Sequence, residues 1–511
     1  MKSYFKLLFQ RAVVVSLCLL IQVGVLVFGV HYLSGYSVWF NIGMDIVAWL
    51  AVIWIVSCRT EPTYKIAWII PILALPLFGI SFYLLFGGNR LSRRLKRRMQ
   101  TVQQIHMDNL TQDMRVLERE QALSPEAALQ SNYLIRVAGC PVCENTESTY
   151  YACGEAAVGD MLDAIARAER YIFLEYFIIQ TGRLWEQMLR LLRKKAAAGV
   201  DVRVIYDDFG CIMTLPGGYW RKLEKVGIKA CPFNPYVPVL SSRLNNRDHR
   251  KFLIVDGEIG FTGGMNLADE YINLEERFGY WKDCVIRLKG EAVWPMTVMF
   301  LAMWAQIKGW KETVSFYKPP RPIAISKRPH GFVQPFADSP LDNEPVGDTV
   351  FFNLITKARR SVYIMTPYLI ISDKMISALT VAVKNGVDVR IITPGIPDKK
   401  MVFAVTRAHY ADLLSQGVKI YEYSPGFVHA KVVCVDREYA VVGTVNFDFR
   451  SLYLHFEDGV WLYKADCVGA VARDFDETFQ LCHRMSLAEV RSWPIHRRLA
   501  GAFLRLFSPL M

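Results

Sequence analysis

The sequence lacks the signatures of the common cofactor-dependent enzymes. It contains neither a P-loop nor the G-x-G-x-x-G turn, the glycine-rich motifs that cradle nucleotide phosphates. Its 11 cysteines include a single C-x-x-C pair, Cys140 and Cys143, which together with Cys153 offers three ligands where a structural zinc site needs four. We therefore expect no cofactor and no metal, and the cysteine spacing does not predict a disulfide framework.

Charge is also scarce, but only near the N-terminus. Residues 12–31 carry no charged side chain, and an apolar run of this length predicts a transmembrane helix. A signal peptide is the alternative, but two more apolar segments follow, at 38–57 and 66–86. We expect transmembrane helices at about 12–32 and 38–57, while Pro71 and Pro76 favour a re-entrant hairpin for the third segment.

Basic residues set the expected orientation and partners. The formal net charge is +12, which suits anionic lipids or nucleic acid. Arginines cluster just after the third segment, and the positive-inside rule then puts the N-terminus and the rest of the chain on the cytoplasmic side. This predicts a multi-pass cell-membrane protein with an anchor over 1–90 and a basic connector over 91–130.

The remainder of the chain repeats itself. Gly199-Val-Asp-Val-Arg-Val-Ile is matched by Gly386-Val-Asp-Val-Arg-Ile-Ile, each step reading as a helix end followed by a buried strand. The order of strands and helices predicts an α/β fold with βαβ units in two similar lobes, 131–318 and 346–511. A proline-rich linker over 319–345 separates them. The C-terminal tail reads as an amphipathic helix, lying either on a membrane or on the protein core.

One constellation occurs once in each lobe. Both copies read H-x-K-x4-D, then a glycine seven residues after the aspartate and an asparagine three residues beyond that glycine. Matched offsets inside a wider repeat make chance occurrence a poor explanation. The residues are His249, Lys251, Asp256, Gly263 and Asn266 in the first lobe, and His429, Lys431, Asp436, Gly443 and Asn446 in the second. Gly264 and Thr444 directly follow the two glycines.

The spacing has a chemical meaning. Histidine and lysine two residues apart on a strand point to the same face. The glycine-rich turn lets backbone approach a phosphate closely, and the asparagine amide can donate there. Two lobes placed face to face would gather two histidines, two lysines and two asparagines around one phosphodiester. Asp256 and Asp436 follow the strands, so we expect them to fix loops or lysines and not to touch substrate.

These residues resemble the phospholipase D superfamily, whose hallmark is the duplicated His-Lys-Asp motif, and within it the bacterial cardiolipin synthases. The Gly443–Ser451 stretch, the Pro-containing third apolar segment and the Phe-Ser-Pro-Leu ending are similar to that subgroup. The resemblance implies two pseudo-symmetric lobes, each a mixed sheet flanked by helices, with the active site at their interface. Two departures stand out: His455 where asparagine is expected, and Gly264 where many relatives have serine.

The resemblance also implies the reaction and its partners. A phosphatidyl group would pass between two phosphatidylglycerol molecules through a phosphohistidine, giving cardiolipin and glycerol, with His249 the nucleophile by similarity and His429 the acid/base. The lysines, the asparagines, Gly264 and Thr444 would hold the phosphate, and the carboxylates of Asp283 and Glu457 would orient the imidazoles. The apolar anchor argues against a nuclease and thus against nucleic acid, whereas homo-oligomerisation stays open.

Overall fold

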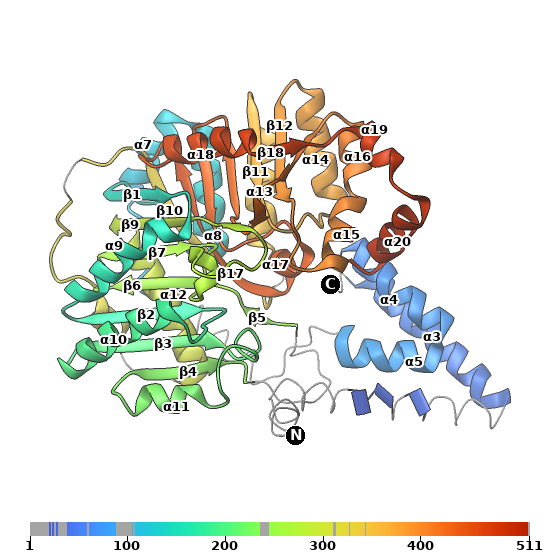
Figure 1. The fold of residues 1–511 in the computed structure, drawn as a ribbon, viewed down its shortest axis with the longest axis horizontal. Helices are drawn as coiled ribbons and strands as arrows, with labels where there is room; N and C mark the ends of the chain where they lie inside the picture. The colour runs from blue at the N-terminus through green and yellow to red at the C-terminus, as the bar shows by residue number, and fades with distance from the viewer. Residues whose placement is uncertain are drawn as a thin grey trace.

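Two β-sheets form the body of the molecule, and a group of helices projects from one side (Figure 1). The computed structural model describes residues 38–58, 61–87, 108–235, 245–309, 313–325, 328–342 and 344–508, with residue 105 and a few single residues between 20 and 28. The expected membrane segment at 12–32 and the arginine cluster therefore lie largely outside the described residues.

The first sheet has seven strands in the order β1-β9-β7-β6-β2-β3-β4. β2, β3 and β4 are parallel and joined by helices, as the βαβ pattern predicts, whereas β6, β7 and β9 pair antiparallel. The sheet is therefore mixed. Its strands are β1 (Thr146–Tyr151), β2 (Tyr171–Tyr176), β3 (Asp201–Asp207), β4 (Lys229–Phe233), β6 (Lys251–Val255), β7 (Ile259–Gly263) and β9 (Val285–Gly290).

The second sheet repeats this plan in the order β10-β17-β16-β15-β11-β12-β13-β18. Here β11, β12 and β13 are parallel, and the other neighbouring strands pair antiparallel. Its strands are β10 (Phe332–Asp338), β11 (Ser361–Met365), β12 (Asp388–Pro394), β13 (Lys419–Tyr423), β15 (Val432–Val435), β16 (Tyr439–Gly443), β17 (His455–Tyr463) and β18 (Cys482–Arg484). The two pseudo-symmetric α/β lobes are thus confirmed, and Gly199 and Gly386 both take the positive φ of a helix end (90° and 88°).

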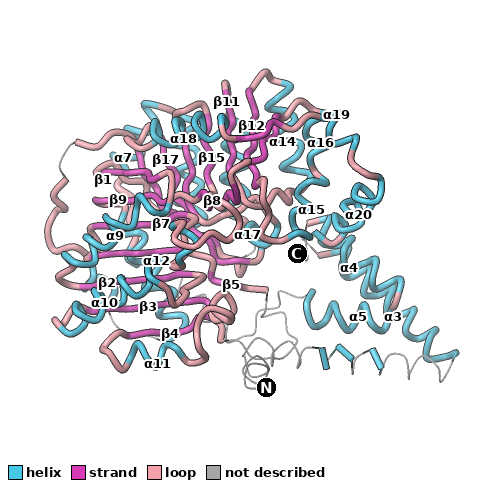
Figure 2. The backbone as a smooth tube through the Cα atoms, viewed as in Figure 1, coloured by secondary structure: helices cyan, strands magenta, loops and turns pink. Residues whose placement is uncertain are grey.

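Helices cover the outer faces of both sheets, and one lies between them (Figure 2). α12 (Val293–Lys308) is buried over nearly its whole length and packs on β2, β6 and β10, so one hydrophobic core runs through both lobes. The others are α9 (Gly154–Arg167), α10 (Arg183–Ala197) and α11 (Tyr219–Glu224) in the first lobe, and α13 (Val346–Lys357), α14 (Asp373–Lys384), α15 (Lys400–Ala408), α16 (Tyr410–Ser415), α17 (Phe449–Tyr453), α18 (Val468–Gln480) and α19 (Leu487–Ser492) in the second.

Segments outside the expected lobes join the second one. β10 forms within the stretch expected to be a proline-rich linker and pairs along its whole length with β17. α8 (Pro125–Ala138), which follows α7 (Met114–Leu123), packs on α13 and β10. The amide of Asn353 donates to Gln130 across that contact (3.0 Å). The second lobe is therefore completed by residues from both sides of the first.

The projecting helices are α3 (Val38–Ser57), α4 (Pro62–Ala74), α5 (Pro76–Phe82) and the π-helical turn η1 (Tyr83–Gly87). The third apolar segment does fold back on itself, since α4 and α5 meet at Pro76 and both pack on α3. Within the described part of the chain, no helix combines the length and apolarity needed to cross a bilayer. The expectation of a transmembrane helix at 38–57 is not met there, although the helix itself is present.

The C-terminal helix α20 (Ile495–Leu506) is amphipathic as expected, and it packs on the core. Gly501 lets it approach Ala404 and Ala408 of α15, and Arg505 pairs with Asp412 (2.6 Å). Its other face leaves four large apolar side chains in solvent. They are Ile495, Leu499, Phe503 and Leu506.

Candidate active site

Two short strand pairs that cross between the lobes position the motif histidines. β5 (Arg247–Asp248) pairs in parallel with the start of β17, and β14 (Gly426–Val428) pairs in parallel with β8 (Tyr280–Lys282). The backbone N–H of His249 then donates to Phe456 O (2.9 Å), and that of His429 donates to Lys282 O (2.7 Å). The residue that follows Phe456 is Glu457, and the residue that follows Lys282 is Asp283. Each histidine therefore lies beside an acid of the opposite lobe.

A carboxylate from the opposite lobe contacts each imidazole. His249 Nδ1 is 2.8 Å from Glu457 Oε2, and His429 Nδ1 is 2.8 Å from Asp283 Oδ2. Both acids are completely buried. A carboxylate anion can only accept, so Nδ1 carries the proton and the Nε2 lone pair is left for chemistry. The structure thus pairs each predicted histidine with a predicted acid. Each pair joins the two lobes, an arrangement that the repeat in the sequence did not specify.

Burial and the partner charges decide the protonation states. Burial lowers the pKa of His429 to about 4 and that of His249 well below its ordinary value, against the opposing effect of the acids. Burial alone would raise the pKa of Glu457 and Asp283, but the adjacent imidazoles outweigh it and both pKa values are lowered. Near neutral pH each pair is consequently a neutral imidazole held by an anion.

The two motif lysines, Lys251 and Lys431, lie next to the motif histidines and are almost fully buried. Lys251 Nζ donates to the carbonyl of His249 (2.6 Å), and Lys431 Nζ donates to the carbonyl of His429. Burial lowers the pKa of Lys251 to about 8 and that of Lys431 to about 7. The charge of Lys251 acts on His429 and Lys431 as well, so the two motifs share one electrostatic site.

The two asparagines differ in their contacts. Asn266 Oδ1 accepts from the backbone of Ile178 (3.0 Å), and its amide donates to the hydroxyl of Tyr271 (2.9 Å). Asn446 is equally buried, yet its Oδ1 has no partner among the described residues. Neither amide is shown on a phosphate, so that role stays a prediction.

Thr444 and Gly264 differ from the expectation that they hold the phosphate. The Thr444 hydroxyl donates to Glu457 Oε2 (2.5 Å) and is fully buried, so it supports the carboxylate. At the matching Gly264, an added Cβ would meet Asp283 Oδ1 at 2.0 Å. The first lobe therefore has no space beside Asp283 for a side chain that would match Thr444. The carboxylate of Asp283 instead accepts hydrogen bonds from the backbone N–H of Cys284 (2.8 Å) and from the indole N–H of Trp281 (3.3 Å).

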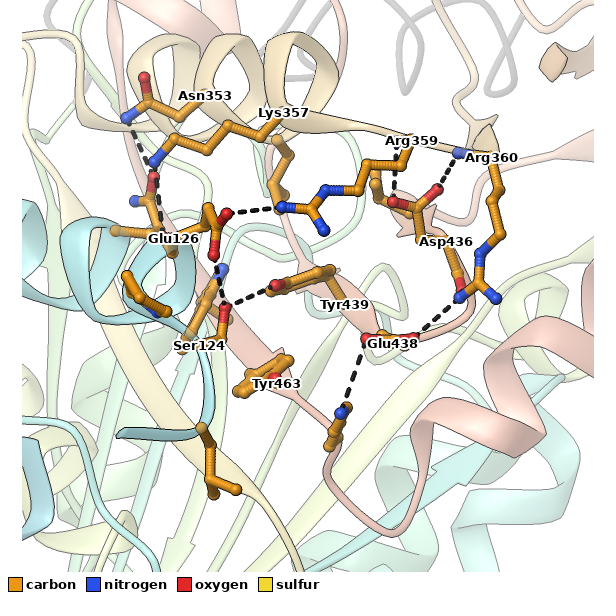
Figure 3. A pocket seen from close by; sticks show the side chains of 17 residues that line it. Ser124, Glu126, Asn353, Lys357, Arg359, Arg360, Asp436, Glu438, Tyr439 and Tyr463 are labelled. Carbon is orange, nitrogen blue, oxygen red and sulfur yellow. Dashed lines mark hydrogen bonds and ion pairs between the residues drawn. The ribbon is translucent and has the colours of Figure 1, made fainter. Parts of the chain in front are cut away.

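Asp256 and Asp436 lie at the far ends of their strands, away from the histidines. Each has a φ of 53° and accepts three backbone N–H bonds from the loop that leads into the neighbouring strand. Figure 3 shows Asp436 between Arg359 and Arg360, at the edge of a cavity of about 490 Å³ whose arginines are paired with Glu126 and Glu438. These contacts fit the expected role of Asp436 in fixing the loop. The arginines that line the cavity are already paired with carboxylates, so we assign the cavity no catalytic role.

Sequence reasoning missed a buried polar layer next to Lys251. The Thr262 hydroxyl donates to Asp458 Oδ2 (2.5 Å), Arg250 pairs with Glu175 (2.5 Å), and all four side chains are buried. Burial raises the pKa of Asp458 to about 7. Charged residues inside otherwise apolar strands were the available signal, since burial without partners is costly.

His455 was noted only as a departure, yet it lies in the site. Its ring centroid is 5.6 Å from that of His249, and its Nδ1 is 3.5 Å from Glu457 Oε1. In the part of the chain that the structure describes, His249, His455 and Glu457 form the one group whose potential metal-ligating atoms lie within 4.8 Å of one another. Hydrogen bonding of His249 to Glu457 explains this proximity without an ion, so the metal-free site stays a prediction.

Comparison with known proteins agrees with this geometry. The family described as "Cardiolipin synthase, PLD-like domain" matches residues 161–280 and 351–479, and "Phospholipase_D-nuclease N-terminal" matches 46–88. A cardiolipin synthase of Geobacillus kaustophilus is 34% identical over 88% of this chain and 89% of its own, and an uncharacterized protein of Streptococcus mutans is 41% identical over 90% and 99%. The structure of a phosphatidylserine synthase from Haemophilus influenzae covers 75% of this chain and all of its own with a TM-score of 0.56 at 13% identity, which shows the fold alone. Two copies of the domain and relatives of this identity along nearly the whole chain place the protein in the cardiolipin synthase family of phospholipase D-like proteins.

Proposed function

We propose that this protein is a cardiolipin synthase, a phosphatidyltransferase that joins two phosphatidylglycerol molecules and releases glycerol. The observation that carries the proposal is the pair of neutral imidazoles, each held at Nδ1 by a buried carboxylate and each next to a buried lysine. Two such groups can act on one phosphorus from opposite sides. A nucleophile activated in this way forms a covalent intermediate.

The reaction has two displacements at phosphorus. One Nε2 attacks the phosphodiester, so that an N–P bond forms while the P–O bond to glycerol breaks. The other imidazole, neutral in the free site, must take up a proton when the anionic phosphodiester binds beside it, and it then gives that proton to the leaving alkoxide. The second histidine then takes the proton from the hydroxyl of another phosphatidylglycerol, whose oxygen attacks phosphorus and breaks the N–P bond. By similarity to the family, His249 is the nucleophile and His429 the acid/base.

The remaining polar groups stabilise charge. Lys251 and Lys431 are positioned to balance the negative charge that grows on the equatorial oxygens, with Asn266 and Asn446 as amide donors. One phosphodiester replaces another, so the exchange needs no nucleotide. The lysines supply the positive charge that a metal would otherwise provide.

We further propose that the catalytic lobes lie on the cytoplasmic face of the cell membrane. α3 and α4 expose many large apolar side chains, among them Trp49, Leu50 and Ile53, which water does not favour. α20 lies against α4 and adds its own exposed apolar face, flanked by Arg497 and Arg498. An apolar stripe bordered by arginines suits an interface of anionic lipid.

Product analysis tests the function. Purified protein in phosphatidylglycerol vesicles should release free glycerol and form cardiolipin in equal amounts. Phosphatidic acid in place of cardiolipin would mean that water is the acceptor and that the protein is a hydrolase. His429→Ala, which should form neither cardiolipin nor phosphatidic acid, is the matched control.

A further inference from the structure

A cavity of about 470 Å³ lies between the projecting helices and the second lobe, next to the active site. Its walls come from the start of α4, the end of η1, the loop after β10, and α17 with the residues that follow it. His455 is among the lining residues, and its ring centroid lies 5.6 Å from that of the His249 imidazole. The cavity therefore extends from the apolar helices toward the reacting histidines.

Specific contacts hold the helices against this wall. The ring of Tyr64 stacks on Phe449, with centroids 5.6 Å apart and planes 4° from parallel. The hydroxyl of Tyr453 donates to Glu61 Oε1 (3.2 Å), and that of Tyr64 donates to Gly87 O (3.2 Å). These bonds fix the start of α4 on α17, so the cavity has a built wall on the side of the apolar helices.

The chemistry of the walls excludes a phosphate-binding role. None of the described residues that line the cavity is a lysine or arginine, and three are acids. Burial raises the pKa of Glu61 and raises that of Asp338 well above its ordinary value, and Asp338 also accepts the backbone N–H of Gly347 (2.7 Å). The rest of the surface is largely apolar, with Pro62, Leu452 and Leu454 among its members.

We propose that this cavity binds the glycerol-ester part of the phosphatidyl group, with the phosphate at the lysines and the acyl chains running out along α4. A pocket of this size suits the glycerol backbone, its esters and the first methylenes of the chains, while longer chains need the apolar surface outside it. The Nδ1 of His455 faces Glu457 Oε1 at 3.5 Å, while its Nε2 has no hydrogen-bond partner among the described residues and is left for a hydrogen bond to the bound lipid. The inference rests on the proposed phosphatidyl transfer.

Filling the cavity tests the proposal. Ser339 lines it from the loop after β10 and is only half-buried, so Ser339→Trp can narrow the space without opening the core. We expect the variant to raise KM for dioctanoyl phosphatidylglycerol at least about tenfold. Its kcat/KM for bis(4-nitrophenyl) phosphate, a phosphodiester without acyl chains, should stay within about twofold of wild type. Ser339→Ala is the matched control and should leave both values unchanged.

Each other result contradicts the proposal in its own way. Equal losses on both substrates would mean that the tryptophan damages the histidines. Leu454→Phe, from the part of the wall that follows α17, would then have to separate the two substrates, or the proposal fails. An unchanged KM for the lipid would overturn it directly. If wild type releases no glycerol from phosphatidylglycerol, the proposed function fails first, whereas an active wild type with an indifferent Ser339→Trp removes the cavity assignment alone.

Discussion

The two halves of the active site share a backbone plan but differ in the side chains around it. In both, a histidine binds an acid of the opposite lobe, and the residue two positions before that acid packs on the imidazole. That residue is His455 beside His249 and Trp281 beside His429, with ring centroids 5.6 and 5.4 Å apart. Tyr271 and Phe427 also pack on the imidazole of His429, whereas Phe177 packs on that of His249. His455 in turn lines the cavity beside α4.

This difference shows which features the duplication must keep. The crossed strands make each imidazole depend on both lobes, so neither lobe alone contains a complete His–carboxylate pair. The groups behind the carboxylates are free to diverge, as Thr444 and Gly264 did. The imidazole of His429 is therefore enclosed by three aromatic side chains, whereas that of His249 lies between one aromatic ring and a second histidine.

Removing either histidine should have the largest effect. We expect His249→Ala and His429→Ala each to lower transfer by at least about 10⁴-fold, since residues that act as one unit fail together. The two variants should still differ: His429→Ala should accumulate a phosphohistidine on His249, and His249→Ala should not. Labelled lipid phosphorus and acid lability of the trapped adduct provide the measurement. Wild-type activity in either variant would disprove the mechanism, and an adduct only in His249→Ala would reverse the assigned roles.

Neutralising the crossed carboxylates should come next. Glu457→Gln and Asp283→Asn keep the shape but remove the charge that selects the Nδ1–H tautomer, and a comparable change in a serine protease triad costs about 10⁴ in kcat. We expect losses of about 10³- to 10⁴-fold in both, measured as glycerol release. A loss below about tenfold in one variant alone would show that the half-sites are not equivalent in function.

Raising the pH should reduce activity through the lysines. Burial lowers the pKa of Lys431 to about 7 and of Lys251 to about 8. A lysine is charged below its pKa, so the positive charge is present at lower pH and is lost as pH rises through this range. We expect kcat/KM to begin falling above about pH 7, as Lys431 loses its charge, and to fall more steeply above about pH 8, where Lys251 loses its charge as well. Lys431→Arg should move that limb upward, whereas a flat profile to pH 10 would show that the lysine charge is not needed.

The sequence predicted much of this site because the catalytic motif occurs once in each lobe. The matched offsets from His249 and His429 identified the lysines and the asparagines, and the resemblance to the family pointed to the acids Asp283 and Glu457. The crossing of partners was not predictable, since β5 and β8 are short strands whose pairing is decided by how two lobes pack. The hydroxyl of Thr444 was assigned to phosphate because motif spacing places a residue near the site but does not say which neighbour it faces.

Losing the Thr444 hydroxyl should have a moderate effect confined to one half-site. Thr444→Val removes a hydrogen bond to the charged Glu457, and such bonds contribute about 1.5–3 kcal/mol. We expect kcat to fall roughly tenfold to a hundredfold, while Thr444→Ser retains the donor and most of the activity. A purely structural role would lower the melting temperature of both variants alike without this split.

Chelation should have the smallest effect, and it separates the half-sites in a different way. His249, His455 and Glu457 could together offer three ligands to a divalent ion, while Trp281 takes the place of the third ligand beside His429. Because two buried lysines already supply positive charge, we expect EDTA to leave transfer within about twofold of the untreated rate. Added Zn²⁺ should inhibit by tying up His249, and His455→Asn should relieve that inhibition. Loss of activity in EDTA that zinc or magnesium restores would show that an ion belongs to the catalytic site and that the lysines alone are insufficient.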